Sequence, residues 1–141
     1  MIELEVLTGE SVQAIDITDA VQARVHAASG FLWLSTPHTT AALTLCEADS
    51  DMLADIARVA AGLMAPFEPF RHRRNDNPNA SAHLMSSIFG TQLVLPIADG
   101  QLGLGTYQRI VFVELDGPKQ RRVQFDVLPA LATGPGEARP R

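Results

Sequence analysis

Short segments in which apolar and polar residues alternate, separated by turn signals, constrain the fold of this chain more than any other feature. A period of two along a segment is typical of a half-buried β-strand. Asp99-Gly100 and the turn at 116–118 separate the last segments, so these segments are expected to pair as antiparallel hairpins. About eight strands are predicted, at 1–7, 12–17, 31–35, 41–47, 91–97, 102–104, 108–115 and 121–128.

Three segments between the strands carry helix signals instead. Each begins at a residue that can cap a helix and continues with apolar residues on one face. These elements together predict an α+β, mostly β fold, with a sandwich-like pair of antiparallel sheets. The predicted helices are Thr18 to Ala28, Asp49 or Ser50 to Leu63, and Ala80 to Phe89 with Asn79 as its cap.

A single domain accounts for most of the chain. Its 141 residues fit one domain that buries a core without disulfides or metal. We assign the domain to residues 1–128. Residues 129–141 contain three prolines and two glycines and show no apolar periodicity, so they are predicted to form a flexible C-terminal tail.

The single cysteine, Cys46, excludes an internal disulfide and favours a reducing compartment. The first residues lack the basic segment of a signal peptide. No apolar run approaches the roughly 18 residues that a membrane span needs. We therefore expect a cytoplasmic protein that has no membrane partner. Cys46 lies among apolar residues and is interpreted as a core residue.

The charges are distributed unevenly along the chain. Residues 1–70 carry ten acidic and two basic residues, whereas residues 71–141 carry six acidic and nine basic residues. A net charge of −5 makes the chain a poor general binder of nucleic acid. Nearly all the basic residues of the second half are arginines, which suit forked contacts to phosphate. An anion site is expected there, although single arginines are more often solvated.

Three of the four histidines are candidate metal ligands. His72 lies in a basic loop and His83 one turn into the third predicted helix, so the two can converge. His38 follows a proline between two apolar strands and is the natural third ligand of a zinc-like site. The spacing matches no short zinc motif, so a metal site stays one alternative. His26 is interpreted as a helix residue without a role in the site.

The start of the third helix is a candidate anion site. Its free N–H groups would point past Asn79, and Arg71, Arg73 and Arg74 lie just upstream. An ordinary capped helix beside a solvated loop is the alternative. Glu47 ends an apolar strand and is a candidate general base or partner of a histidine.

Several motifs, in order along the chain, resemble the YjbQ-like family, also called the secondary thiamine-phosphate synthase family. The resemblance covers nearly the whole chain before the tail. It is carried by HTTAALTLCEADSDMLADI at 38–56, FRH at 70–72, NASAHL at 79–84, LPIADGQLGLGTYQ at 95–108 and ELDGPKQRRVQFDV at 114–127. The sequence departs from the family pattern at Cys46, Met85 and Tyr107, where asparagine, lysine and tryptophan are common.

The resemblance implies a distorted antiparallel β-sandwich that assembles as a homotrimer. It also implies a weak synthase activity, which joins hydroxymethylpyrimidine diphosphate to a thiazole phosphate and releases diphosphate. A divalent metal, zinc or magnesium, is implied at His38, His72 and His83. The implied catalytic residues are His83, His72, Glu47 and Gln108, and the implied ligand- or cofactor-binding residues are Thr40, Asn79 and Thr106.

Two hypotheses about function follow from the residues and the resemblance. The first is an enzyme that acts on a small phosphorylated compound. The second is a non-enzymatic trimeric protein that binds a metal or an anion. A weak, promiscuous activity is compatible with either hypothesis.

Overall fold

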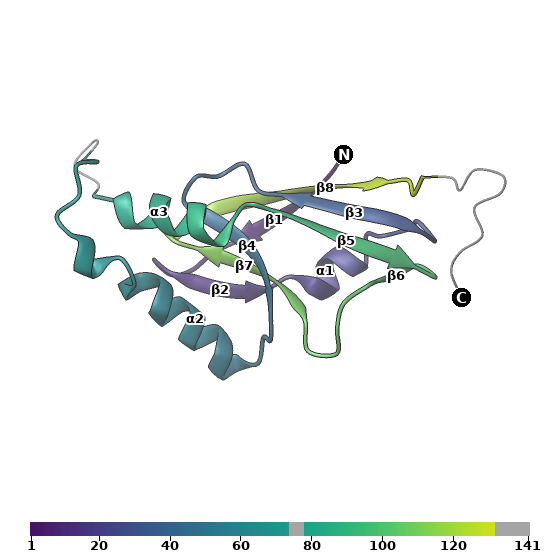
Figure 1. Ribbon diagram of the computed structural model, residues 1–141, viewed down its shortest axis with the longest axis horizontal. Coiled ribbons are helices and arrows are strands. Elements are labelled where there is room, and N and C mark those ends of the chain that lie inside the picture. Colours follow the sequence, from purple (N-terminus) through teal and green to yellow (C-terminus); the bar gives the residue numbers. More distant parts are fainter. Residues whose placement is uncertain (74–77, 132–141) are drawn as a thin grey trace.

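The computed structural model describes residues 1–73 and 78–131. Within these residues the chain forms eight strands and three α-helices, as predicted, and one short 3-10 helix, η1 at Ala65–Phe67 (Figure 1). Arg74 and most of the predicted tail, residues 132–141, lie outside the described residues. The strands are β1 Ile2–Leu7, β2 Gln13–Asp16, β3 Gly30–Ser35, β4 Ala41–Cys46, β5 Gln92–Ala98, β6 Gln101–Leu102, β7 Arg109–Glu114 and β8 Gln120–Leu128. The α-helices are α1 Thr18–Gln22, α2 Ser50–Gly62 and α3 Ala80–Phe89.

The strands form two antiparallel sheets. The larger sheet has the order β1-β8-β3-β5-β6 and the smaller has the order β2-β7-β4. The predicted hairpin at Asp99-Gly100 is confirmed, and both residues have the positive φ of a two-residue turn. The predicted α+β, mostly β architecture with paired antiparallel sheets is therefore confirmed.

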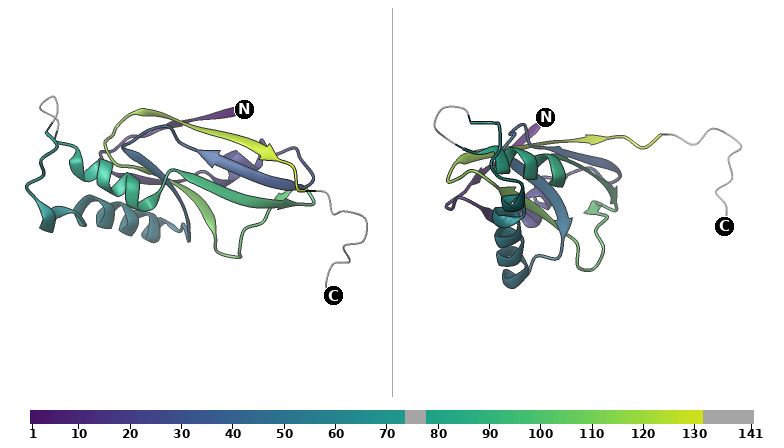
Figure 2. Two further views of the ribbon diagram at one scale, coloured as in Figure 1. Left: turned by 45° about the horizontal axis from the view of Figure 1, so that its top comes forward. Right: turned by 60° about the vertical axis from the view of Figure 1, so that its left-hand side comes forward.

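Two apolar cores explain how the layers stack. Ile110 and Phe112 of β7 are buried with residues of the larger sheet, such as Phe125. Val111 and Val113, on the opposite face of β7, are buried with residues of α2 and α3. Because strand side chains alternate between faces, β7 serves both cores at once. The two helices lie together beside the sheets, away from the end of β8 (Figure 2).

The first helix is shorter than predicted. It ends at Gln22, and His26 lies beyond it as an exposed residue. The Gln22 amide explains the early end, because it donates to the Gly100 carbonyl and accepts from the Leu102 N–H, both at 3.0 Å. These bonds tie the helix end to the β5–β6 hairpin and turn the chain toward β3.

The second helix begins as predicted, since the Asp49 side chain accepts from the Met52 N–H at 2.7 Å. Cys46 is partly buried and packs against the second core, in agreement with its predicted place. Among the described residues, no helix combines the length and the apolar character that a membrane span requires.

Candidate functional site

The loop between β3 and β4 begins where a proline interrupts the sheet. β3 pairs with β8 only up to its last residue. Two residues further along the same register Pro37 would lie opposite Arg122, and proline has no N–H group to donate. Side chains of the loop satisfy Arg122 instead: His38 Nε2 accepts from its N–H at 3.1 Å, and Thr36 Oγ1 donates to its carbonyl at 3.0 Å.

This contact determines the chemistry of the His38 ring. A neutral imidazole whose Nε2 accepts a hydrogen bond carries its proton on Nδ1. Burial lowers the pKa of His38, and the positive charges of Arg121 and Arg122 lower it further. At neutral pH, His38 is therefore an uncharged ring that carries its proton on Nδ1. Its Nε2 lone pair is occupied by the Arg122 N–H and is not available to a metal ion.

His83 and His72 lie side by side at the start of α3. His83 is half-buried in the first part of the helix, whereas His72 is exposed in the segment that precedes it. Their ring centroids are 5.0 Å apart, and the rings meet edge to face. Two imidazoles on one zinc ion, each with its nitrogen about 2.0–2.1 Å away, also have centroids roughly 5 Å apart. The pair is thus compatible with a shared metal and equally with a plain ring contact.

His38 and His83 line one pocket, which we call the histidine pocket. Its volume is about 430 Å³. Five hydroxyl side chains also line it, and the described residues around it include no acidic side chain. Three of these hydroxyls, those of Thr36, Ser86 and Ser87, donate to main-chain carbonyls. A pocket without a carboxylate still suits an anion better than a cation. Its residues are Thr36, Pro37, His38, Thr39, His83, Ser86, Ser87, Gly90 and Thr91.

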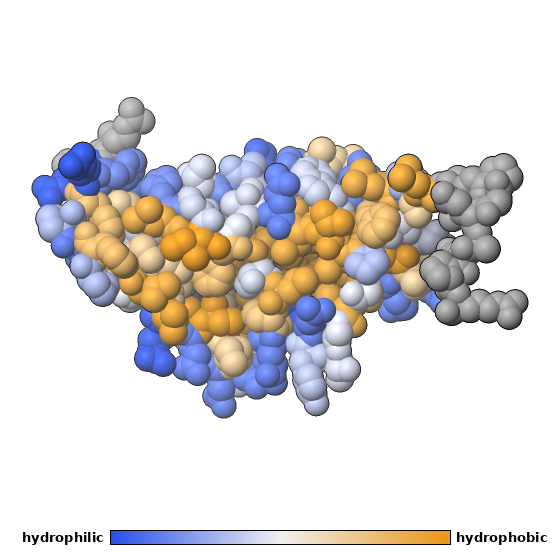
Figure 3. All heavy atoms as spheres, viewed as in Figure 1, coloured by the Kyte–Doolittle hydropathy of each residue, from blue (hydrophilic) through white to orange (hydrophobic). Residues whose placement is uncertain are grey.

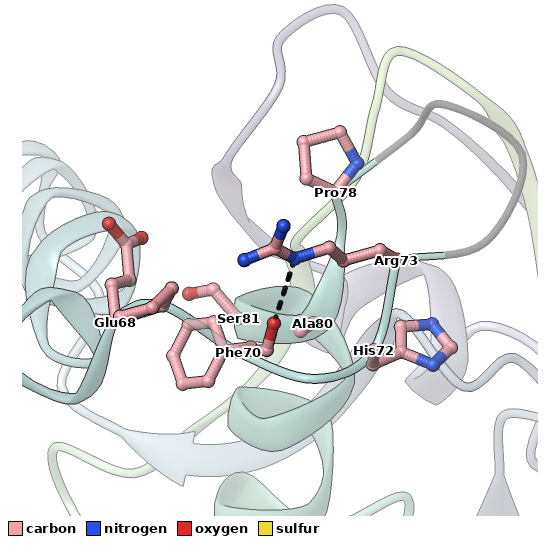
Figure 4. Close-up of a pocket in the computed structure, with 8 residues that line it drawn as sticks. Glu68, Phe70, His72, Arg73, Pro78, Ala80 and Ser81 are labelled. Atoms are coloured by element: carbon pink, nitrogen blue, oxygen red, sulfur yellow. Dashed lines mark hydrogen bonds between the residues drawn. The ribbon is translucent and has the colours of Figure 1, made fainter.

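A second pocket, also about 430 Å³, lies at the start of α3 and is lined by His72 (Figure 4). In Figure 4 the Arg73 side chain extends over the helix start, and its Nε donates to the Phe70 carbonyl at 3.1 Å. Glu68 lines the same pocket, so it contains a cation and a carboxylate. We call it the Arg73 pocket. The two pockets meet at the His72–His83 pair.

The capping residue of α3 behaves differently from its prediction. Asn79 occupies the capping position, but its side chain makes no hydrogen bond to the helix. Its amide donates instead to Asp116 Oδ2 at 3.1 Å, and the Lys119 ammonium donates to the same oxygen at 3.1 Å. Asn79 therefore precedes the helix as predicted, but its side chain binds Asp116 and makes no capping hydrogen bond. A carboxylate therefore already lies beside the helix start at which the sequence predicts a phosphate.

A buried ion pair, which the sequence analysis missed, lies beneath the loop that carries His38. Glu114 is 0% exposed and Arg121 is 5% exposed. Arg121 donates from Nε to Glu114 Oε1 at 2.8 Å and from Nη2 to Oε2 at 2.6 Å. Thr8 Oγ1 also donates to Oε1 at 2.8 Å. The N–H groups of Leu115 and Asp116 donate to Oε2 at 3.0 and 3.1 Å, so both carboxylate oxygens are fully engaged.

The charge state of this pair follows from its contacts. Burial alone raises the pKa of Glu114, but the hydrogen bonds from Arg121, Thr8 and Asp116 outweigh it and hold the pKa below its ordinary value. A sequence signal for the pair does exist. The alternation that directs Val123 and Phe125 inward also directs Arg121 inward, at a position where an apolar residue is expected.

Thr40 lies beneath the histidine pocket and not in its wall. It is 6% exposed, and Arg121 Nη2 donates to its Oγ1 at 2.8 Å and to its carbonyl at 3.2 Å. Thr40 is therefore buried against Arg121 and does not line the histidine pocket, as a ligand-binding residue would. It connects the end of the His38 loop to the buried pair.

The remaining predicted residues lie in the β6–β7 loop and after β4, outside both pockets. Thr106 and Gln108 belong to the loop between β6 and β7, which extends away from α3 (Figure 1). Gln108 Oε1 accepts from the Gly105 N–H at 2.8 Å, so this side chain supports its own loop. Glu47 follows β4, whose six residues span on the order of 17 Å from the His38 loop. Within one chain, Glu47 and Gln108 do not reach the histidines.

The metal site at His38, His72 and His83 stays a prediction. In the chain as far as Arg73, and from Pro78 to Leu131, no three His, Cys, Asp or Glu side chains gather closely enough to hold a metal ion. The rings of His72 and His83 are in edge contact, whereas His38 Nε2 accepts from the Arg122 N–H.

Fold and site together define a class: a small α+β protein of two packed antiparallel sheets, with two helices beside the smaller sheet and a histidine-lined pocket near one of them. The family model described as UPF0047 protein YjbQ-like matches residues 2–130. The chain belongs to this family, and the resemblance drawn from its motifs is confirmed.

Relatives and solved structures agree over most of the chain. A UPF0047 protein of Archaeoglobus fulgidus is 42% identical over 121 residues, which are 86% of this chain and 95% of the relative. The UPF0047 protein YugU of Bacillus subtilis is 36% identical and covers 84% of this chain and 91% of its own. The crystal structure of APE1520 from Aeropyrum pernix superposes with a TM-score of 0.83 at 37% identity, covering 91% of this chain and 97% of that one. These names specify no activity, so they establish family and fold.

Proposed function

We propose that this protein binds and converts a small phosphorylated compound, whose phosphate or diphosphate lies in the histidine pocket. The donor set of that pocket carries the proposal. It combines His38 and His83 with five hydroxyl side chains, of which those of Thr36, Ser86 and Ser87 already donate to main-chain carbonyls. No carboxylate among the described lining residues opposes an anion. Donors fixed in a partly enclosed site stabilise phosphate oxygens strongly. The adjoining Arg73 pocket adds a guanidinium, which suits a ligand with two anionic groups.

The proposed reaction is the one that the resemblance implies, a thiamine-phosphate synthase reaction of low rate. The thiazole nitrogen forms a bond to the methylene carbon of hydroxymethylpyrimidine diphosphate. The bond between that carbon and the diphosphate oxygen breaks, and its electron pair leaves with diphosphate. Such a displacement depends on alignment and on neutralising the leaving group. His83 lines the pocket and His72 lies against it, so the proposal assigns both the role of donating to that group.

A divalent metal at His72 and His83 stays part of the proposal. The imidazole pair favours zinc, because magnesium prefers oxygen ligands. A bound zinc ion would supply positive charge next to the phosphate. The other ligands would be phosphate oxygens or side chains of a neighbouring copy, since the described chain brings two rings together and His38 Nε2 already accepts from the Arg122 N–H.

The second candidate is a non-enzymatic protein that binds a metal or an anion. One observation favours it: β4 separates Glu47 from the His38 loop, and the β6–β7 loop that contains Gln108 extends away from α3. Within a single chain, such a pocket would bind phosphate without Glu47, the predicted proton carrier. Under both candidates we propose a cytoplasmic protein that has no nucleic-acid partner.

A homotrimer would reconcile the two groups of motif residues. Head-to-tail contact between copies could bring Glu47, Thr106 and Gln108 of one chain to the histidine pocket of the next. Apolar residues gather in a band over α2 and the neighbouring strands (Figure 3). Val59 and Leu63 of α2 are 49% and 47% exposed, and Phe67 of η1 is 68% exposed, which supports contact with another copy.

Turnover of the two thiamine precursors tests the enzymatic proposal. Metal content would first be measured on the purified protein, and the wild type would then be compared with His83→Ala and with His26→Ala. His26 is exposed and lies outside both pockets, so it is the matched control. We expect His83→Ala to lose about 10²–10⁴-fold in rate, with little change for His26→Ala. Equal rates in all three proteins would reject the enzyme, and bound phosphate without turnover would favour the binding protein.

Mixing two inactive variants tests the shared site. His83→Ala damages the histidine pocket, and Gln108→Ala damages the β6–β7 loop. If each site takes one end from each of two copies, refolding the variants together should restore part of the activity, because some sites receive two intact halves. Light scattering gives the number of copies. Absence of recovery in a protein shown to be trimeric would contradict the shared site.

A further inference from the structure

We propose that the buried Glu114–Arg121 pair is a positioning element of the histidine pocket, which holds the 36–40 loop so that His38 presents its Nδ1–H. This role rests on the proposed function, because it concerns the donor that would meet the phosphate. His38 is the residue through which the pair acts. Neither charged group lines the histidine pocket itself.

Two neighbouring residues of β8 anchor the loop at three points. The Arg121 guanidinium binds Thr40 through both the side chain and the carbonyl. The main chain of Arg122 binds the Thr36 hydroxyl and His38 Nε2. The loop leaves the sheet at Pro37, so these bonds replace the regular ladder that would otherwise hold it. The direction of the His38 ring therefore depends on where β8 places Arg121 and Arg122.

Glu114 fixes Arg121 from the opposite side. The carboxylate takes two of the guanidinium N–H groups in a forked contact, and Thr8 together with two main-chain N–H groups holds the carboxylate in turn. Arg121 Nη2 is shared between Glu114 and Thr40. A guanidinium is planar and rigid, so once Glu114 fixes its plane the position of Thr40 is fixed as well.

Burial of the pair points to positioning. A buried ion pair gains little stability over apolar residues of the same size, because both charges lose their water. Four elements of the fold nevertheless converge on this one: the turn after β1, the His38 loop, the end of β7 and the start of β8. An arrangement with so many fixed partners provides directional precision at the one place where the sheet is interrupted beside the pocket.

The decisive comparison is Arg121→Lys against Arg109→Lys. Both substitutions keep a positive charge and remove two guanidinium bonds to carboxylate oxygens, but Arg109 lies at the opposite end of β7, with one bond each to Asp16 and Asp19. A lysine at 121 could keep its charge beside Glu114 yet could not hold Glu114 and Thr40 together in one plane. The measurements are the nitrogen-15 spectrum of the His38 imidazole and calorimetric titration with inorganic phosphate and diphosphate.

We expect wild-type His38 to show a single tautomer protonated at Nδ1, and Arg121→Lys to show a mixture with the Nε2 tautomer. Phosphate affinity should fall about 10–100-fold in Arg121→Lys and stay within about twofold in Arg109→Lys. A lysine variant with an unchanged His38 spectrum and unchanged affinity would overturn the positioning role. If Arg121→Lys does not fold, the double variant Glu114→Gln/Arg121→Met, which buries no charge, takes its place with the same expectations.

The two proposals fail separately in this experiment. If the wild type binds neither phosphate nor diphosphate, the proposed function is contradicted. The His38 spectrum still decides the positioning role in that case, since it needs no ligand. If the wild type binds phosphate and both lysine variants bind it equally well, the function stands and the positioning role is contradicted.

Discussion

Each end of β7 is held by an arginine bound to carboxylate. The arrangement at one end, which we call the dry pair, is buried, and the arrangement at the other end, which we call the wet cluster, is partly exposed to solvent. At the end of the strand, Glu114 and Arg121 are 0% and 5% exposed. At its beginning, Arg109 is 37% exposed and binds Asp16 at 2.7 Å and Asp19 at 3.0 Å. The same pair of chemical groups therefore occurs in two environments of one strand, which separates the effect of burial from that of charge.

The difference explains which end can carry a precise site. Water screens the Arg109 cluster and can replace either partner, so its geometry is only weakly enforced. The Glu114–Arg121 pair has no such substitute, because a lone charge at that position would lack both water and a counter-charge. The histidine pocket lies beside the dry pair. The loop that contains Thr106 and Gln108 lies beside the wet cluster.

Breaking the dry pair should have the largest effect. Glu114→Gln removes the negative charge and leaves the Arg121 guanidinium buried without a counter-charge. We expect the free energy of unfolding to fall by about 3–5 kcal/mol, measured by urea denaturation. Glu114→Gln/Arg121→Met should recover much of that loss, because it buries no charge and Gln still accepts from the neighbouring N–H groups. A double variant as unstable as the single one would show that lost packing, and not an unpaired charge, is responsible.

Acid should weaken the same pair without mutation. The pKa of Glu114 lies below its ordinary value, so the folded state binds the proton less readily than the unfolded chain does. Its contribution to stability is complete above the unfolded pKa, about 4.3, and is lost as the pH falls through the lower folded value. Urea midpoints would be compared between about pH 7 and pH 3. The double variant should lose stability less steeply below about pH 4.3 than the wild type, and identical slopes would contradict the assignment.

The sequence predicts the fold better than it predicts the site. Alternation and turn signals locate the strands, because each is a local property of a few residues. The first helix is overestimated because a distant bond from Gln22 to the β5–β6 hairpin ends it. Asn79 occupies the predicted capping position, but local sequence does not reveal that its side chain binds Asp116, which is remote in sequence. Side-chain contacts between residues remote in sequence depend on the tertiary structure and cannot be predicted from local sequence.

In the site too, the residues could be predicted from local motifs, whereas their long-range contacts could not. The motifs identify His38, His72 and His83, and the structure places His72 against His83 and His83 in one pocket with His38. The Nδ1 proton of His38 depends on the Arg122 N–H, which is remote in sequence. Arg121 was detectable, since an arginine in phase with inward apolar residues violates the strand pattern. Such a violation is itself a signal of a functional or strained position.

Removing the wet arginine should cost less than breaking the dry pair. Arg109→Met removes both carboxylate contacts, yet Asp16 keeps its hydrogen bonds from the Thr18 N–H and hydroxyl at 3.0 and 2.7 Å. Asp16 is also partly exposed, so water can solvate it. We expect a loss of about 1 kcal/mol in the free energy of unfolding, measured by the same urea titration. A loss as large as that of Glu114→Gln would erase the distinction between the two ends.

The exposed pair Arg58–Asp55 is expected to contribute least of the three arginine–carboxylate arrangements to the free energy of unfolding. Its side chains are 78% and 61% exposed and 3.4 Å apart, one turn apart on α2. Arg58→Met should change the free energy of unfolding by only about 0.2–0.5 kcal/mol, because water replaces each partner at little loss. The variants Arg58→Met and Arg109→Met differ mainly in how far the arginine is buried and in how many carboxylates it contacts. If both variants gave the same small loss, the Arg109 cluster would count as ordinary surface charge, and only the dry end of β7 would have a structural role that depends on charge.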